Sequence, residues 1–165
     1  TRATMLPRLF LRSSPVHGCG CYTLDPIRAG SRVAEYDGPR MPKPEADERY
    51  RDREVTYLFG VSDRDIVIDG FGTAMFINHS CEPNCQTEED DERIFVLALR
   101  NIAAGEELSY EYHLYDSDDD DQPCYCGTDA CRGTMFSEKE VKRRKKLGLP
   151  LTLRKRKKAK TAHKD

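Results

Sequence analysis

The sequence centres on ten residues, Phe76-Ile77-Asn78-His79-Ser80-Cys81-Glu82-Pro83-Asn84-Cys85. After an apolar lead-in, this stretch carries amide, imidazole and thiol groups, which can donate or accept hydrogen bonds or bind a metal. An ordinary turn needs far fewer such groups. We therefore interpret the stretch as the centre of an active site.

Three more cysteines follow in the motif Cys124-x-Cys126-x4-Cys131. The total of 7 cysteines is odd, and the clustering favours metal thiolates in a reducing compartment over disulfides. A structural zinc site takes four tetrahedral ligands, so one ligand must come from elsewhere in the chain. The candidates for that fourth ligand are Cys81, Cys85, His79 and His113.

Short β-rich segments separated by tight turns dominate the chain, without the βαβ alternation of a parallel nucleotide-binding sheet. The pattern predicts a mainly β, α+β domain. Strands are expected within residues 8–12, 31–36, 55–61, 65–69, 93–100 and 108–112. Helices are expected over residues 44–53, on the surface, and over residues 138–147, with a capping box at the start and Gly148 at the end. Residues 17–22 are expected to form a glycine-containing loop that can approach a ligand closely.

Charge is divided unevenly along the chain. Residues 138–165 hold 13 of the 27 Lys and Arg and 3 of the 29 Asp and Glu, so residues 1–137 are strongly acidic. An acidic body favours a Lys- or Arg-rich polypeptide partner, although acids also serve simply to keep a small domain soluble. The basic residues 138–165 indicate nucleic-acid binding, a cellular targeting signal or a solvated, disordered tail.

No apolar run approaches the roughly 20 residues of a membrane span, and no signal peptide is visible. We therefore expect a soluble, monomeric, intracellular protein in a reducing compartment, without a membrane partner. If the basic C-terminal segment is a targeting signal or contacts DNA, the protein is expected in the nucleus or at the nucleoid. The chain begins at Thr1, so we expect the natural N-terminus to lie upstream.

Six motifs, in their order along the chain, resemble those of SET-domain protein-lysine methyltransferases with a post-SET zinc segment. They are His17-Gly18-Cys19-Gly20, Val33-Ala34-Glu35-Tyr36-Asp37-Gly38, Tyr57-Leu58-Phe59, the ten residues quoted above, Gly105-Glu106-Glu107-Leu108-Ser109-Tyr110-Glu111-Tyr112, and Cys124-Tyr125-Cys126 to Cys131-Arg132-Gly133. The resemblance covers residues 7–136. It implies a β-clip of several short sheets, in which the segment bearing Tyr112 crosses the loop bearing Asn78 like a pseudoknot. The corresponding units are a SET domain (1–116), an acidic loop with the post-SET zinc segment (117–136), and a basic helix with a tail (137–165).

The resemblance also implies an activity and its residues. S-adenosylmethionine would donate a methyl group to the ε-amine of lysine in a basic protein such as a histone tail. Tyr112 would be the catalytic tyrosine, and Tyr57 and Tyr110 would line the channel for the substrate lysine. The donor pocket would be lined by His17, Gly18, Cys19, Gly20, Tyr57, Asn78, His79 and Tyr125. Structural zinc would be held by Cys81, Cys124, Cys126 and Cys131, with Cys85 as the alternative ligand.

A lysine ammonium has no lone pair with which to attack a methyl group, so the site must favour the neutral amine and align it with the donor. Tyr110 stands where the family alternates between Phe and Tyr, and a hydroxyl there leaves less room for added methyl groups. We therefore expect mainly monomethylation, with some dimethylation. The alternative functions are a zinc-stapled interaction module without turnover and a nucleic-acid-binding protein acting through residues 138–165.

Overall fold

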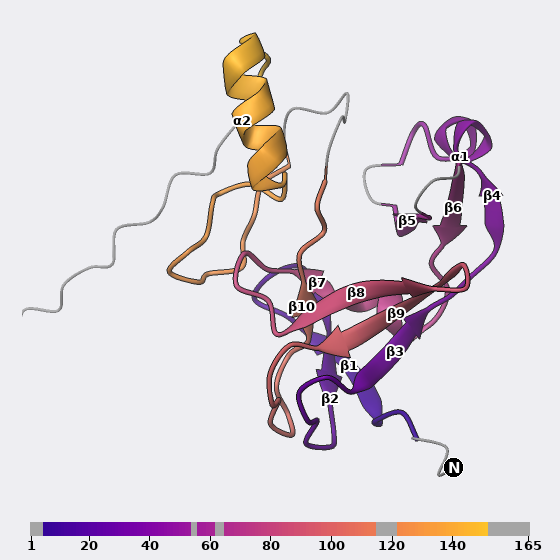
Figure 1. The fold of residues 1–165 in the computed structure, drawn as a ribbon, viewed down its shortest axis with the longest axis vertical. Coiled ribbons are helices and arrows are strands. Elements are labelled where there is room, and N and C mark those ends of the chain that lie inside the picture. Colours follow the sequence, from indigo (N-terminus) through magenta and orange to yellow (C-terminus); the bar gives the residue numbers. More distant parts are fainter. Residues whose placement is uncertain (1–4, 54–55, 62–64, 115–121, 152–165) are drawn as a thin grey trace, which may run out of the picture.

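The computed structural model describes residues 5–53, 56–61, 65–114 and 122–151 of the 165-residue chain. Within these ranges, short strands in four small sheets form most of the fold (Figure 1). One antiparallel sheet has the strand order β3 (Arg32–Tyr36), β9 (Arg93–Ala98) and β8 (Cys85–Asp90). A second has the order β4 (Arg40–Pro42), β6 (Ile66–Asp69) and β5 (Leu58–Gly60). The fold is therefore mainly β, as predicted.

The other two sheets have two strands each. β1 (Leu9–Ser13) pairs antiparallel with β2 (Cys19–Thr23). β7 (Asn78–His79) and β10 (Ser109–Tyr110) run parallel, with Tyr110 opposite His79. Parallel strands need a long crossover connection, which here contains β8 and β9. This pairing brings the Asn78-His79 pair beside the tyrosine-rich segment, in agreement with the predicted crossing.

The core is formed by the apolar residues of these strands. β9 lies between two other strands, and four of its six residues are buried. A strand with neighbours on both sides and little solvent contact is expected to be almost continuously apolar, which explains the prediction for residues 93–100. Ile68, Ile77 and Leu108 join the same buried cluster. The segment before β7 is therefore anchored by its apolar lead-in.

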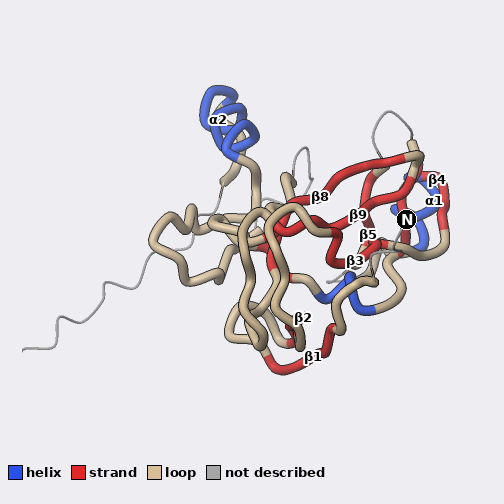
Figure 2. Tube along the Cα trace, turned by 60° about the horizontal axis from the view of Figure 1, so that its bottom comes forward, coloured by secondary structure: helices blue, strands red, loops and turns tan. Residues whose placement is uncertain are grey.

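The helices lie outside this core. α1 (Lys43–Arg49) is shorter than the predicted residues 44–53. α2 (Glu138–Leu147) begins where Ser137 Oγ accepts a hydrogen bond from the Glu140 amide and ends at left-handed Gly148, as predicted. Figure 2 shows α2 apart from the strands. The 3-10 turn η1 (Thr73–Phe76) leads into β7. In the part of the chain that the structure describes, no helix is long and apolar enough to cross a membrane.

Three local predictions are wrong. Residues 17–22 were expected to form a loop, but from Cys19 onward they belong to β2. This strand pairs along its whole length with β1, and the pairing outweighs the low strand propensity of glycine. β8, an acidic segment without clear alternation, was not predicted as a strand. The strand expected over residues 108–112 is confined to β10. The predicted acidic loop at residues 116–121 and the tail at 154–165 lie outside the described residues.

Candidate active site and metal centre

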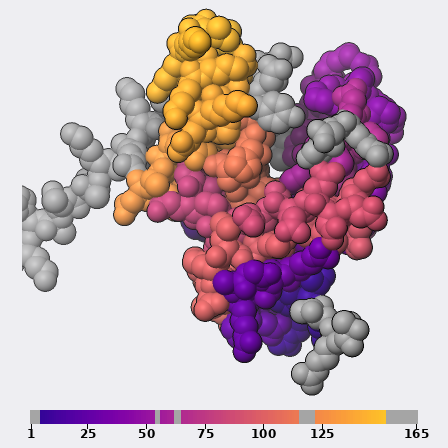
Figure 3. All heavy atoms as spheres, viewed as in Figure 1, coloured from indigo at the N-terminus to yellow at the C-terminus, as the bar shows by residue number. Residues whose placement is uncertain are grey.

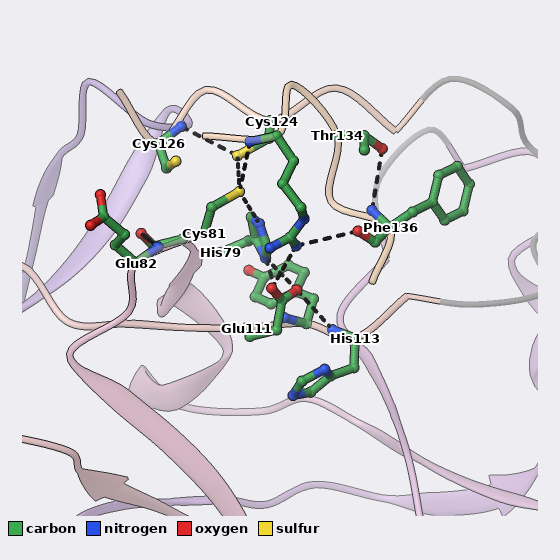
Figure 4. Close-up of polar contacts among 12 residues, drawn as sticks. His79, Cys81, Glu82, Glu111, His113, Cys124, Cys126, Thr134 and Phe136 are labelled. Carbon is green, nitrogen blue, oxygen red and sulfur yellow. Dashed lines mark hydrogen bonds and ion pairs between the residues drawn. The ribbon is translucent and has the colours of Figure 1, made fainter. Parts of the chain in front are cut away.

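Four cysteines converge on one point. The Sγ atoms of Cys81, Cys124, Cys126 and Cys131 all lie within 4.8 Å of one another. Those of Cys81 and Cys124 are 3.7 Å apart (Figure 4). Tetrahedral zinc with Zn–S bonds of about 2.3 Å requires S–S distances of roughly 3.8 Å. The donor set and spacing therefore fit structural zinc. Cys85, the alternative ligand, is fully buried in the apolar core and does not belong to the cluster.

Backbone amides surround these thiols. The Arg132 amide donates to Cys81 Sγ at 3.4 Å, and the Cys126 amide donates to Cys124 Sγ at 3.5 Å. Such N–H···S contacts favour the thiolate that a metal needs. The segment from residue 122 onward is thereby attached to the stretch that follows β7.

His79 connects this cluster with the tyrosine segment. Its Nδ1 accepts a hydrogen bond from the Tyr112 amide at 3.2 Å, and its Nε2 lies 3.5 Å from Cys81 Sγ. Burial lowers the pKa of His79 to about 3, so the ring is neutral. Since Nδ1 is the acceptor, the proton lies on Nε2 and faces the thiol. One imidazole thus fixes both the Tyr112 backbone and the sulfur of Cys81.

Asn78 lies beside it but uses its side chain within the protein. Its Nδ2 donates to the Cys19 carbonyl at 3.0 Å and to Glu107 Oε1 at 2.9 Å. Glu107 also accepts hydrogen bonds from Ser14 Oγ and the Tyr22 hydroxyl. Asn78 therefore joins β7 to β2 and to the segment before β10.

A pocket of ≈ 190 Å³ lies next to this junction, between β7 and the cysteine segment. Asn78 and His79 line it together with Val16 and Cys126, which are sequence neighbours of His17 and Tyr125. The structure thus brings the Asn-His pair to the same pocket as residues adjoining both other donor motifs. The side chains of Tyr57 and Tyr125 are exposed to 38% and 47%, and His17 and Gly18 are exposed as well.

Two of the three predicted catalytic tyrosines, Tyr110 and Tyr112, form a cluster of rings, whereas the Tyr57 ring packs against Phe76. Tyr110 and Tyr112 have ring centroids 4.9 Å apart, and Phe59 lies 6.3 Å from Tyr110. The Tyr112 hydroxyl donates to the Ile77 carbonyl at 2.9 Å. Burial, followed by the nearby Tyr57, raises the pKa of Tyr112, and burial also raises the pKa of Tyr110. Both phenols therefore stay protonated at neutral pH, and neither can act as a general base there.

Sequence reasoning missed a pair of charged residues between the two clusters. Glu111 accepts from Arg132 Nη2 at 2.5 Å, and its other carboxylate oxygen lies 3.4 Å from His79 Nδ1. Arg132 Nη2 also donates to the Phe136 carbonyl at 3.2 Å. The sequence did contain a signal for Glu111. The alternation that puts Tyr110 and Tyr112 on one face of the strand puts Glu111 on the other face.

Asn84 is a third residue whose role the sequence did not reveal. The buried amide donates from Nδ2 to the Glu107 carbonyl at 2.8 Å and to Glu106 Oε1 at 3.1 Å. Its Oδ1 accepts from the Ser109 amide at 2.9 Å. These contacts attach the stretch after β7 to the segment that enters β10.

Fold, cysteine cluster and crossing together define a SET domain. The family model described as "SET domain" matches residues 18–113. The chain therefore belongs to the SET domain family.

Named relatives agree with this assignment. The "Histone-lysine N-methyltransferase, H3 lysine-4 specific" of Saccharomyces cerevisiae is 41% identical over 143 residues, which are 78% of this chain and 13% of that protein. "Histone-lysine N-methyltransferase ATX2" of Arabidopsis thaliana is 40% identical over 147 residues, 81% of this chain and 13% of that protein. The chain thus spans about 13% of the length of these curated relatives.

A solved structure shares the fold. It is a humanized mutant of the Chaetomium thermophilum Polycomb Repressive Complex 2 bound to the inhibitor GSK126, with a TM-score of 0.58 and 27% sequence identity. The match covers 66% of this chain and 15% of the chain in that structure.

Proposed function

We propose that this SET domain transfers a methyl group from S-adenosylmethionine to the ε-amine of lysine in a histone tail. The observation that carries the proposal is the parallel pairing of β7 with β10, which places Asn78-His79 against the tyrosine cluster and beside a pocket. The two relatives named above are histone-lysine methyltransferases, and both match over more than three quarters of this chain. Histone as substrate makes the nucleus the expected compartment.

The residues around the pocket fit the methyl donor. Asn78 and His79 line the pocket directly, and Val16 and Cys126 bring the segments of the other two donor motifs to its edge. Backbone groups of residues 17–20 and the Asn78-His79 pair would hold the donor, with Tyr57 and the exposed Tyr125 flanking it. When bound, S-adenosylmethionine supplies a methyl group on a cationic sulfonium.

The chain's own residues position the amine. A lysine ammonium has a pKa of about 10.4 in water, and the low-dielectric tyrosine cluster favours its neutral form, with the proton passing to solvent. The Tyr112 hydroxyl donates its proton to the Ile77 carbonyl, which leaves its oxygen lone pairs as acceptors for the incoming amine. Catalysis is then mainly alignment in a fixed geometry.

The four clustered cysteines would hold structural zinc, which supplies folding free energy to the segment from residue 122 to Phe136. His79 lies against this cluster, so order in the cysteine segment supports the donor pocket. We propose that the metal takes no part in methyl transfer. We further propose units at residues 1–116, 117–136 and 137–165.

Methylation of histone H3 by wild type and by Tyr112→Phe, with labelled donor, tests the proposal. Loss of the aligned hydroxyl should lower kcat by about 100-fold. Tyr50→Phe is the matched control, because it removes a phenol that contacts Asp69, and neither residue lines the pocket; it should keep wild-type activity. Donor binding by wild type without transfer to any lysine peptide would instead identify a non-catalytic interaction module.

A further inference from the structure

α2 presents to solvent a face of four lysines, which also carries the exposed Glu138 in its first turn. With 3.6 residues per turn, Lys139, Lys142, Lys145 and Lys146 lie within an arc of about 120° around the helix axis. Glu140 and Arg144, each only 4% exposed, lie on the opposite side. All four lysines lie on the solvent side of the helix. Figures 1 and 3 show α2 projecting from the body of the protein.

The buried side of α2 is fixed, so the lysine face has a defined orientation. The Arg144 guanidinium stacks over the Phe136 ring at 4.2 Å from the centroid. It also donates to the Pro150 carbonyl and to Glu140, both at 2.9 Å. Phe136 itself is fully buried and adjoins the cysteine segment. The helix is therefore a rigid extension of that segment.

The charge of this face is only partly offset locally, because the four lysines share it with one carboxylate, Glu138. Glu140 binds Arg143 and Arg144, which accounts for the two arginines of the helix. Among the residues that the structure describes, none of the four lysines forms an ion pair. A surface of several like charges that remains unpaired on a rigid support favours a polyanionic partner.

We propose that this lysine face docks on the phosphate backbone of duplex DNA, so that the enzyme engages histone tails on nucleosomes better than free tails. The inference rests on the proposed function and deepens it by naming a second contact of the same substrate. Lysine ammonium groups act as point charges on phosphates, and the run from Lys139 to Lys146 spans about 10 Å. Duplex DNA offers one phosphate per roughly 1.7 Å of axis, so several phosphates lie within reach.

The composition of the face argues against other polyanions. Stacking on single-stranded nucleic acid requires aromatic side chains, and the face has none. The proposed contacts are to phosphates, which carry no sequence information, so binding through these lysines should be independent of sequence. A stable acidic protein interface would need aromatic or aliphatic anchors. The lysine face contains none, and the nearest apolar residue, Val141, lies outside its arc and is partly buried.

Binding of a duplex of about 20 base pairs, followed by fluorescence anisotropy across salt concentrations without methyl donor, tests the proposal. The full chain is compared with the variant Lys139→Gln/Lys142→Gln/Lys145→Gln/Lys146→Gln. Four lost phosphate contacts should reduce the slope of log K against log salt by about 3.6 and weaken binding at low salt. An unchanged slope would overturn the proposal, because residues 152–165 would then carry the binding.

The matched control removes four positive charges near α1, as Lys43→Gln/Arg49→Gln/Arg51→Gln/Arg53→Gln. These residues include exposed partners of surface ion pairs, which contribute little stability. The control should keep the wild-type salt slope. An equal loss in the control would show that bulk charge, not the α2 face, determines binding, and would refute the proposal.

Methylation of an H3 peptide and of nucleosomes separates this proposal from the proposed function. The α2 variant should methylate the peptide like wild type and nucleosomes at least about tenfold more slowly at low salt. DNA binding without any methylation would leave the docking surface intact and reject the enzymatic proposal. Slower nucleosome methylation with unchanged DNA binding would assign the face to an acidic protein surface, and the DNA proposal would be wrong.

Discussion

Replacing Asn84 by Asp tests how the chain crossing is held together. The substitution keeps the size of the side chain and keeps the oxygen that accepts from the Ser109 amide. It removes the two donated hydrogen bonds, to the Glu107 carbonyl and to Glu106 Oε1. It also places a second carboxylate beside Glu106 at a position that is only 3% exposed.

The expected cost follows from these contacts. A buried acceptor left without a donor costs about 1–3 kcal/mol, and the facing carboxylates repel each other in addition. We expect Asn84→Asp to lower the free energy of unfolding by about 3 kcal/mol at pH 7. For a chain of this length that corresponds to a fall in melting temperature of about 6–12 °C.

The loss of unfolding free energy caused by Asn84→Asp should depend on pH in a defined direction. Burial and Glu106 raise the folded-state pKa of the introduced carboxyl above its unfolded value, so the folded state binds the proton more tightly. Once protonated, the introduced carboxyl can donate a hydrogen bond again. The difference from wild type should therefore be largest above the folded-state pKa and should narrow as the pH falls through it.

Thermal unfolding of zinc-loaded protein, followed by circular dichroism at pH 8 and pH 5.5, measures these values. Asn101→Asp is the matched control, because Asn101 is exposed and its Oδ1, which the substitution keeps, accepts from the Ala29 amide. The control should melt like wild type. If Asn84→Asp also melts within about 1 °C of wild type, the hydrogen bonds of Asn84 do not hold the crossing and the reasoning fails.

Three further results are expected. Removing zinc with a chelator, or replacing Cys131 by Ser, should increase hydrogen exchange in residues 122–136 and weaken donor binding, whereas unchanged exchange would show that no metal orders this segment. Tyr110→Phe should raise the proportion of di- and trimethylated lysine in mass spectra, and an unchanged product distribution would contradict the assigned role of its hydroxyl. The ion pairs with Arg143 and Arg144 lower the pKa of Glu140 to about 2, so their stabilisation is complete above pH 4.5 and is lost as the pH falls towards 2. The difference in melting temperature between wild type and Glu140→Gln should accordingly shrink over that range, and a constant difference would show that the pair does not support α2.

Local patterns in the sequence predicted several elements well. The N-cap Ser137 and the glycine after Leu147 specify both ends of α2, because each satisfies backbone groups from within a few residues. The other half of the predicted capping box does not form, since the Glu140 carboxylate binds Arg143 and Arg144. The strands β5 and β6, within the predicted ranges 55–61 and 65–69, and the buried run at 93–98 follow equally from alternation and apolar content. The spacing of Cys124, Cys126 and Cys131 indicated a metal centre without any tertiary information.

Tertiary structure alone decided how these parts meet. Cys81 and Cys85 are four residues apart and chemically equal, yet one reaches the cysteine cluster and the other faces the core, since β8 begins at Cys85. The ten residues around Asn78 were recognisable as a site, but the sequence could not show that the Asn78 amide binds Cys19 and Glu107. Those partners lie far away along the chain and become neighbours only through strand pairing, whose register depends on the whole fold.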